Sequence, residues 1–285
     1  FERTILVKIM IVYDNHLHLN YDGDFLNSVK RFVKEGGNFI NICNLPKMDN
    51  PYNIEYFREQ YEKTMKISKL VKENFNIHVL ITIGPYPVDF IKSEEKLGFE
   101  NAYDLFIKAI DLALEYIKDN KANALGEIGR PHFHVEKIIM DYSNKMLEYA
   151  MHEASKYKIP VILHTESATR ELFAELSTIA ERAGMEKMKV IKHFSPPFIL
   201  EDENFGIFPS VISSRENVKE AMKKGTRFFL ETDFLDDPSR PGAVLDITSV
   251  PRRYRMMENL DREFFKKYVE DVEENLKKIY GIMDL

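Results

Sequence analysis

Disulfide bonds, tryptophan and long apolar runs are all missing from this 285-residue chain. Its single cysteine, Cys43, cannot form a disulfide within the chain, and the apolar segment Phe39–Cys43 predicts a buried, reduced thiol. Such cysteine usage is typical of the cytosol, so we expect a cytoplasmic protein. Because no apolar stretch reaches the roughly 20 residues that a membrane-spanning helix needs, we expect no membrane partner.

The chain also lacks a net positive charge. Lysine and arginine together number 40 against 46 aspartates and glutamates, which gives a formal net charge of −6. The chain as a whole therefore lacks the cationic surface of nucleic-acid-binding proteins, which leaves room only for a local basic patch. The best candidate for one is the segment 251–255, Pro-Arg-Arg-Tyr-Arg. The alternative, which we favour, is a loop or helix start whose arginines form salt bridges.

The chain offers no Gly/Ser-rich linker, low-complexity tract or short repeat, so we expect one domain. Its first methionine is Met10, which immediately precedes the first confident strand. We therefore expect residues 1–9 to be an added leader and residues 10–285 to form the single domain.

Short, nearly continuous apolar runs alternate with helical stretches along the whole sequence. The eight runs are Ile11–Asn15, Asn38–Cys43, His78–Ile83, Ala124–Glu127, Pro160–His164, Lys189–His193, Gly206–Val211 and Arg227–Asp233. Runs of this kind predict parallel strands buried on both faces, and the amphipathic stretches between them predict helices. We therefore predict an α/β protein with a (β/α)8 TIM barrel, and keep a doubly wound open sheet as the alternative. The helix after the sixth strand is the least clear, because prolines and acids crowd that region.

Side chains that can bind metal stand at the ends of five of these runs. They are His16 and His18 after the first run, then Glu127, His164, His193 and Asp233. Alternate residues of a strand point to the same side, so the first two imidazoles aim at one point. A lone histidine at a strand end is more often structural. However, the carboxyl ends of parallel strands meet at one mouth of a barrel, so the whole set is expected to converge there.

This set of ligands predicts metal-dependent hydrolysis. Imidazoles together with carboxylates suit zinc best, and manganese or magnesium less well. Six ligands exceed one tetrahedral site, so two divalent ions are expected to share Glu127 and a water-derived hydroxide. Asp233 is the expected catalytic residue, placed to orient the water, take its proton and pass it to the leaving group.

The ordered motifs resemble a known family over nearly the whole chain. They are Asp14-x-His16-x-His18, Gly126-Glu127-Ile128-Gly129, His164, His193-Phe194-Ser195 and Glu231-Thr232-Asp233. Together they resemble the TatD-like branch of the amidohydrolase superfamily, which implies hydrolysis, in several members of phosphodiester bonds in DNA. The resemblance also implies that one metal is held by His16, His18 and Asp233. Glu127 would bridge, and His164 and His193 would hold the other metal.

Two departures from the family pattern bear on the substrate. Glu166 stands shortly after His164, where TatD nucleases usually carry an arginine, and Arg130 follows the GEIG segment, where they usually carry an acid. A carboxylate at Glu166 would repel a phosphate backbone. Arg130 would meet an anionic group of the substrate or form an ion pair with a loop acid. We take both residues as candidate substrate contacts.

We therefore predict a metal-dependent hydrolase. Three hypotheses describe its role. The first is a TatD-related nuclease acting on DNA ends or short single strands. The second is a hydrolase of a small phosphoester, amide or lactone, and the third is a non-catalytic metal-binding module. The expected partner is thus a small-molecule or short nucleic-acid substrate, and the sequence leaves the oligomeric state open.

Overall fold

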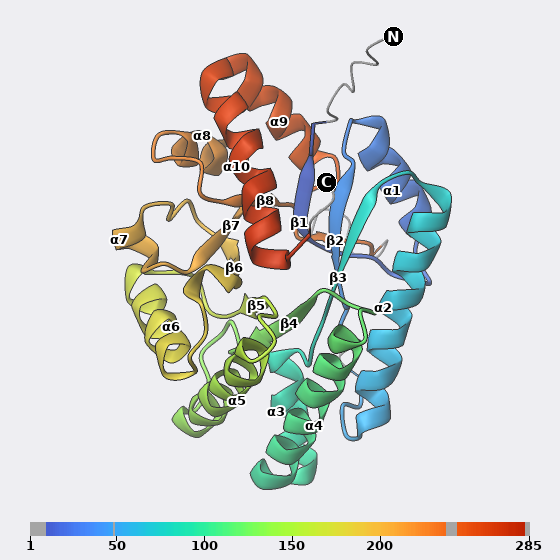
Figure 1. Ribbon diagram of the computed structural model, residues 1–285. Helices are drawn as coiled ribbons and strands as arrows, with labels where there is room; N and C mark the ends of the chain where they lie inside the picture. Colours follow the sequence, from blue (N-terminus) through green and yellow to red (C-terminus); the bar gives the residue numbers. More distant parts are fainter. Residues whose placement is uncertain (1–9, 48, 238–243, 283–285) are drawn as a thin grey trace.

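The computed structural model describes residues 10–47, 49–237 and 244–282. In these ranges a parallel sheet curls into a barrel, with helices packed around it (Figure 1). The strands are β1 Tyr13–His18, β2 Phe39–Cys43, β3 His78–Ile83, β4 Ala124–Gly129, β5 Val161–His164, β6 Val190–Ser195, β7 Phe208–Ile212, β8 Phe229–Glu231 and β9 Phe234–Leu235. The predicted TIM-barrel class is thereby confirmed.

The barrel closes through β9, a strand of two residues that the sequence did not predict. The strand order is β8-β7-β6-β5-β4-β3-β2-β1-β9, and every pairing is parallel. Since β9 follows β8 after only two residues and pairs with β1, the segment 229–235 joins both ends of the sheet. This closure makes the alternative of an open sheet wrong.

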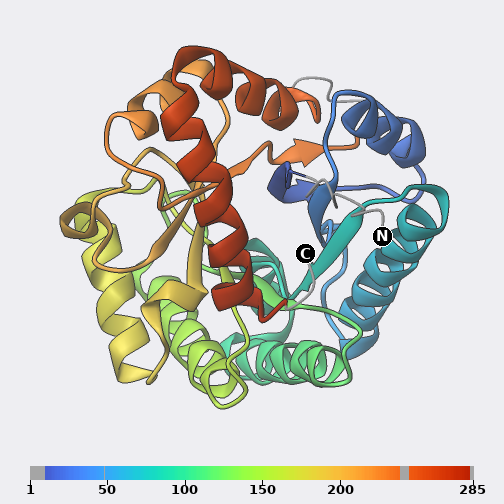
Figure 2. The same cartoon turned by 45° about the horizontal axis from the view of Figure 1, so that its top comes forward.

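The helices surround the barrel on its sides, except that the last of them, red in Figure 2, crosses one end of the barrel. They are α1 Phe25–Lys34, α2 Ile54–Asn74, α3 Pro87–Leu97, α4 Phe99–Lys118, α5 Lys137–Ser155, α6 Arg170–Arg182, α7 Glu201–Asn204, α8 Arg215–Met222, α9 Ser249–Leu260 and α10 Arg262–Tyr280. Side-chain oxygens accept hydrogen bonds from free N–H groups at several helix starts, as Asn53 does for α2 and Asp261 for α10. Among the described helices, none is long and apolar enough to cross a membrane.

Each of the first eight strands contributes at least one residue to a single buried cluster, and we call one residue from each strand the floor layer. Its members are Tyr13, Phe39, Leu80, Ala124, Ile162, Ile191, Phe208 and Phe229. Side chains from all sides of a barrel can meet only in its interior. The floor layer therefore fills the barrel near the amino ends of its strands. Helix α10 packs against the same cluster through Val272, Leu276 and Ile279.

The helix after the sixth strand, which the sequence predicted least clearly, is the shortest α-helix in the described part of the chain. Helix α7 there has only four residues, Glu201–Asn204.

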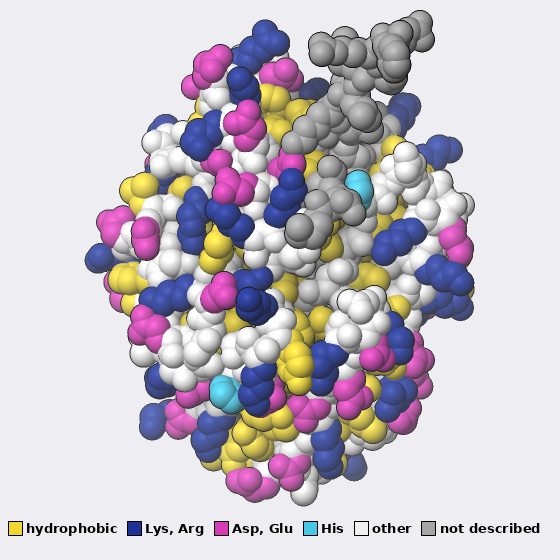
Figure 3. Space-filling model, in the orientation of Figure 1, with side chains coloured by type: hydrophobic (Ala, Val, Ile, Leu, Met, Phe, Trp, Pro, Cys, Tyr) yellow, Lys and Arg dark blue, Asp and Glu magenta, His cyan; other side chains and the backbone are white. Residues whose placement is uncertain are grey.

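Residues 1–9 lie outside the described part of the chain, so the leader stays a prediction. On the face of the molecule drawn in Figure 3, basic and acidic side chains are interspersed.

Candidate metal centre

Four imidazoles converge on the carboxylate of Glu127, on β4. His16 Nε2 lies 3.0 Å and His193 Nε2 lies 2.9 Å from Glu127 Oε1. His164 Nδ1 lies 3.5 Å from the same oxygen, and His18 Nε2 lies 3.9 Å from Glu127 Oε2. All of these side chains are largely buried. The carboxyl ends of β1, β4, β5 and β6 therefore place their ligands around one shared acid, at the end of the barrel that we call the mouth.

The potential metal ligands form three overlapping groups, two of which have the membership of the predicted division. His16, His18 and Asp233 form one group, Glu127, His164 and His193 form another, and His16, His193 and Glu231 form the third. Within each group the ligand atoms lie within 4.8 Å of one another. Asp233 Oδ1 lies 3.6 Å from His18 Nε2 and 3.8 Å from His16 Nε2. All six residues singled out in the sequence thus come together, and their nitrogen and oxygen donors fit a borderline divalent metal.

The charges of the site favour a cation at its centre. Burial alone would raise the pKa of Glu127, but the neighbouring His193 and His16 hold it well below its usual value. Burial lowers the pKa of His18 and of His164 to about 4, so these imidazoles are neutral near pH 7 and keep a free lone pair. The ionised Glu127 and the neutral His18 and His164 are thus in the state that metal binding requires. In contrast, and against the effect of burial, Cys43 and Glu127 raise the pKa of His16 well above its usual value, and Glu127 and Glu231 raise the pKa of His193, so a bound metal would displace the protons of these two imidazoles.

Asp233 is the most accessible member of the set, with 18% of its side chain exposed. Its backbone adopts a left-handed conformation with φ of 51°, and its N–H donates to the carbonyl of His16 over 2.9 Å. Burial raises the pKa of its carboxyl group to about 6. This combination suits a group that meets solvent and exchanges a proton with it.

Asp14 of the first motif joins β1 to the chain after β8. Its carboxylate accepts hydrogen bonds from the backbone N–H of Thr232 at 3.0 Å and from the Thr232 hydroxyl at 2.7 Å. Asp14 is fully buried. Because Thr232 directly precedes Asp233, and Asp14 lies two residues before His16, these bonds fix the position of Asp233 relative to β1.

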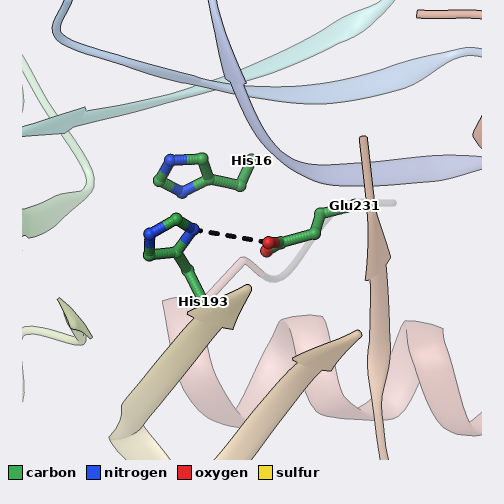
Figure 4. Close-up of side chains that lie close together, drawn as sticks. All are labelled: His16, His193 and Glu231. Carbon is green, nitrogen blue, oxygen red and sulfur yellow. Dashed lines mark ion pairs between the residues drawn. The ribbon is translucent and has the colours of Figure 1, made fainter. Parts of the chain in front are cut away.

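Two residues outside the predicted set contact imidazole nitrogens that face away from Glu127. Glu231 Oε1 lies 3.4 Å from His193 Nδ1, and the imidazole of His193 stacks on that of His16 (Figure 4). Ser210 donates a hydrogen bond to the other oxygen of Glu231. Cys43 Sγ lies 3.2 Å from His16 Nδ1, and the Cys43 carbonyl lies 3.3 Å from His18 Nδ1. Partners of this kind fix the orientation of a ligating imidazole and raise its basicity.

Sequence reasoning assigned neither of these two residues to the site. Glu231 stood in a motif without a role, although it precedes Asp233 by two residues on one strand-like run. Cys43 was predicted only as a buried thiol, and the structure confirms that burial. Both residues stand at the carboxyl end of a predicted strand, as the candidate ligands do. This position was the signal in the sequence that could have indicated them.

Arg130 and Glu166 face each other beside the mouth. Arg130 is 3% exposed, and its Nη1 lies 3.0 Å from both Glu166 Oε1 and Glu175 Oε2. Its Nε donates to Asn144 Oδ1 over 2.7 Å, and its backbone N–H donates to the carbonyl of His164. The ion pair with a loop acid is therefore present, and it ties the loop after β4 to β5. Substrate contact by either residue stays a prediction.

The other basic candidate lies in helix α9, where the favoured interpretation is confirmed. Arg252 and Arg255 pair with Glu35 at the end of α1, and Arg253 donates to the carbonyl of Ser213. These arginines form salt bridges and hydrogen bonds at a helix start, as predicted.

Comparisons with known proteins place the chain in one family. The sequence profile described as TatD related DNase matches residues 13–281. The uncharacterized protein MJ1127 of Methanocaldococcus jannaschii is 32% identical over 288 residues, covering 98% of this chain and 99% of that protein.

Solved structures share the fold at low sequence identity. YjjV, a TatD homolog from Escherichia coli K12, has a TM-score of 0.66 at 18% identity and covers 95% of this chain and 98% of that one. A hydrolase TatD family protein from Entamoeba histolytica has a TM-score of 0.62 at 16% identity, with 95% and 99% covered. At these identities the likeness concerns the fold.

Proposed function

Because this chain belongs to the TatD-related DNase family of metal-dependent hydrolases, we propose that it cleaves phosphodiester bonds in short nucleic-acid strands. The observation that supports this most is the position of Glu127. Its carboxylate lies within 4 Å of imidazoles from both ligand groups, as expected for an acid that two ions share. A mononuclear site would need no such shared acid.

In the proposed site, His16, His18 and Asp233 hold one divalent ion, while His164 and His193 hold the other. Glu127 lies between the two groups and contacts both. Zinc suits this donor set best, and manganese or magnesium are the alternatives. Ions bound here would lower the pKa of a water molecule and polarise the bond under attack.

Asp233 acts on the proton of that water in this proposal. Its partly exposed carboxylate orients the attacking oxygen, accepts one proton from it and then donates the proton to the leaving alkoxide. The two supports behind the ligands, Glu231 and Cys43, keep the imidazoles of His193, His16 and His18 aimed at the site.

A second candidate function is the hydrolysis of a small phosphoester, amide or lactone. It is favoured by the arginines near the mouth and on α9, which already pair with acids. Arg130 contacts Glu166 and Glu175, and both Arg252 and Arg255 contact Glu35. Long nucleic acid would have to displace these acids to gain the same cations. For this reason we propose short strands rather than a long duplex as the substrate.

A panel of substrates separates the two functions. Protein reconstituted with zinc or manganese is assayed on a single-stranded oligonucleotide, on small phosphoesters and on lactones. We expect metal-dependent cleavage of the oligonucleotide and a loss of at least about 1,000-fold in Asp233→Asn, because the proton acceptor is gone. Asp141→Asn, which changes an exposed acid on α5, is the matched control. Activity on small esters or lactones alone would rule out the nuclease.

The remaining proposals concern the location of the protein in the cell and its contacts with the substrate. We infer a cytoplasmic location from the single buried thiol, Cys43. We also keep Arg130 and Glu166 as proposed substrate contacts, since both border the loop after β4 at the mouth.

A further inference from the structure

Two phenylalanine side chains stand exposed beside the metal ligands. Phe194 directly follows the ligand His193 on β6 and is 47% exposed, and Phe133 follows His132 in the loop after β4 and is 46% exposed. Single exposed apolar side chains are common on protein surfaces. Here, however, both rings border the same catalytic centre.

A continuous series of ring contacts joins these two side chains through the metal ligands. We call it the aromatic row, and its members in order are Phe133, His132, His164, His193 and Phe194. Successive ring centroids lie 5.1, 5.1, 5.3 and 6.2 Å apart. The two inner ligands, His164 and His193, form one of the metal groups with Glu127. The exposed phenylalanines thus stand at opposite ends of that group.

The inner part of the row is fixed by hydrogen-bonding contacts. His164 turns Nδ1 toward Glu127, so its Nε2 points away from the ligand group. There it lies 2.9 Å from His132 Nδ1 and 3.4 Å from the hydroxyl of Tyr86. His132 is therefore anchored to a ligand, although its own ring is exposed, and it places Phe133 next to the site.

Phe194 is held in position by the carboxylate that supports His193. Its φ is +52°, a conformation that bulky residues rarely adopt. Its backbone N–H donates to Glu231 Oε1 over 2.6 Å, while the same oxygen lies 3.4 Å from His193 Nδ1. A backbone in this region persists only where its surroundings enforce it. The site therefore fixes where the exposed ring stands.

From this arrangement we propose that Phe133 and Phe194 stack on planar rings of the substrate, one on each side of the bond that is cleaved. This rests on the proposed function, in which the rings are nucleobases flanking a phosphodiester. Any of the nucleobases can stack on an aromatic side chain. The two phenylalanines therefore favour nucleobases over other groups without selecting a particular nucleotide sequence. Bases in a duplex are already stacked on their neighbours, so the row selects unpaired nucleotides.

The charge of the molecule supports stacking as the main source of affinity. The chain carries a net charge of −6, and Arg130 beside the mouth is already paired with Glu166 and Glu175. Attraction of the phosphate backbone is therefore weak, and ring contacts have to supply the affinity for the flanking nucleosides.

The experiment compares three short single-stranded DNAs with a single cleavable phosphodiester, the other linkages being replaced by methylphosphonate. One carries both flanking bases, and each of the others has an abasic residue on one side. The readout is the ratio of kcat/KM for the full substrate to kcat/KM for each abasic one. We expect Phe194→Leu and Phe133→Leu each to lower one of the two ratios about tenfold, on opposite sides of the bond. Phe194→Tyr and Phe133→Tyr keep the ring and should keep the ratios.

Controls separate stacking from structural damage. Leu200→Ala removes another exposed apolar side chain, 43% exposed and outside the row, and should leave both ratios unchanged. Metal content is measured for every variant, and if Phe194→Leu loses metal, the comparison of Phe133→Leu with Phe133→Tyr decides. Ratios unchanged in the leucine variants would overturn the stacking proposal while leaving the nuclease intact. A wild type that cleaves none of these DNAs would instead overturn the proposed function, and the stacking proposal with it.

Discussion

The floor layer and the mouth of the barrel are built from the same strands only two residues apart. The residues two positions beyond the floor layer are Asn15, Asn41, Thr82, Gly126, His164, His193, Ser210 and Glu231. In β2, β3, β7 and β8 an aromatic or aliphatic floor residue is thus followed by a polar one on the same face. The floor stabilises the fold by apolar burial, while the mouth carries polar groups that cost free energy to bury.

Hydrogen bonds between strands offset part of that cost at the mouth. Thr82 donates to Asn41 over 2.9 Å, and Asn15 donates to Ser210 over 2.9 Å. Ser210 in turn donates to Glu231. The comparison predicts that substitutions at the floor change stability and leave the chemistry intact, whereas substitutions at the mouth do the reverse.

The largest effect is expected at the mouth, from removal of the shared charge. Glu127→Gln keeps the shape of the side chain but removes the negative charge on which four imidazoles converge. We expect kcat/KM for the phosphodiester substrate to fall by about 1,000-fold or more, as for groups that stabilise the transition state directly. Glu148→Gln, an exposed acid on α5, serves as control. More than a tenth of wild-type activity in Glu127→Gln would contradict the role of the shared acid.

At the floor, the expected effect is on stability. Phe208→Ala removes a fully buried ring that packs on Phe229 with centroids 4.7 Å apart. We expect the free energy of unfolding, measured by urea denaturation, to fall by about 3–5 kcal/mol. The folded variant should bind as much metal per chain as the wild type. Leu260→Ala, at a position 56% exposed, should change the free energy by less than about 0.5 kcal/mol. Loss of metal from the folded Phe208→Ala protein would show that the two layers are not independent.

A buried carboxylate outside the site shows what burial does without imidazoles. Asp89 of α3 is 2% exposed, accepts a hydrogen bond from Tyr56 at 3.0 Å, and burial raises its pKa from 3.8 to about 6. A raised folded-state pKa means that this group supports folding fully below about pH 4 and that its contribution is lost as the pH rises through about 6. The gap between the two pKa values corresponds to about 3 kcal/mol.

Asp89→Asn does not titrate, which makes the effect measurable. Relative to wild type, we expect the variant to gain stability between pH 4 and pH 7.5 by up to about 3 kcal/mol, read from urea denaturation at each pH. A difference that stays constant with pH would show that Asp89 is not protonated on folding in this range.

The smallest effect is expected for the support behind a ligand. Glu231→Gln keeps the size of the side chain but weakens its interaction with His193 Nδ1 and with the Phe194 N–H. We expect metal affinity, measured by competition with a chelator, to fall about 10- to 100-fold. Glu220→Gln, an exposed acid of α8, is the control. An unchanged affinity would mean that His193 is oriented by its other contacts.

Most of the barrel and the convergence of the six candidate ligands could be predicted from the sequence, for a physical reason. Strands buried on both faces appear as short apolar runs, and their carboxyl ends must meet at one mouth. The predicted run Ile11–Asn15 nevertheless ended three residues before β1 does, and Lys189–His193 ended two residues before β6 does. His16, Glu127 and His193 therefore lie inside their strands, whereas His18 and His164 end theirs and Asp233 follows β8.

The parts that could not be predicted depend on contacts between strands. The pairing register shifts between Asp14 and Leu17, between Leu125 and Ile128, and between Lys192 and Ser195. Each shift encloses a candidate ligand, namely His16, Glu127 or His193, because an irregular strand re-aims a side chain that regular alternation would turn elsewhere. The supports Glu231 and Cys43 depend on the same register, and the closing strand β9 is too short to leave a periodic signal.

Metal stoichiometry tests the central claim most directly. After reconstitution and removal of free metal, elemental analysis should find two ions per chain in the wild type. The double variant His16→Ala/His18→Ala should retain one ion, and so should His164→Ala, because in the proposed division each variant removes ligands from only one of the two ions. A wild type that binds a single ion, or a double variant that keeps both, would contradict the shared site around Glu127.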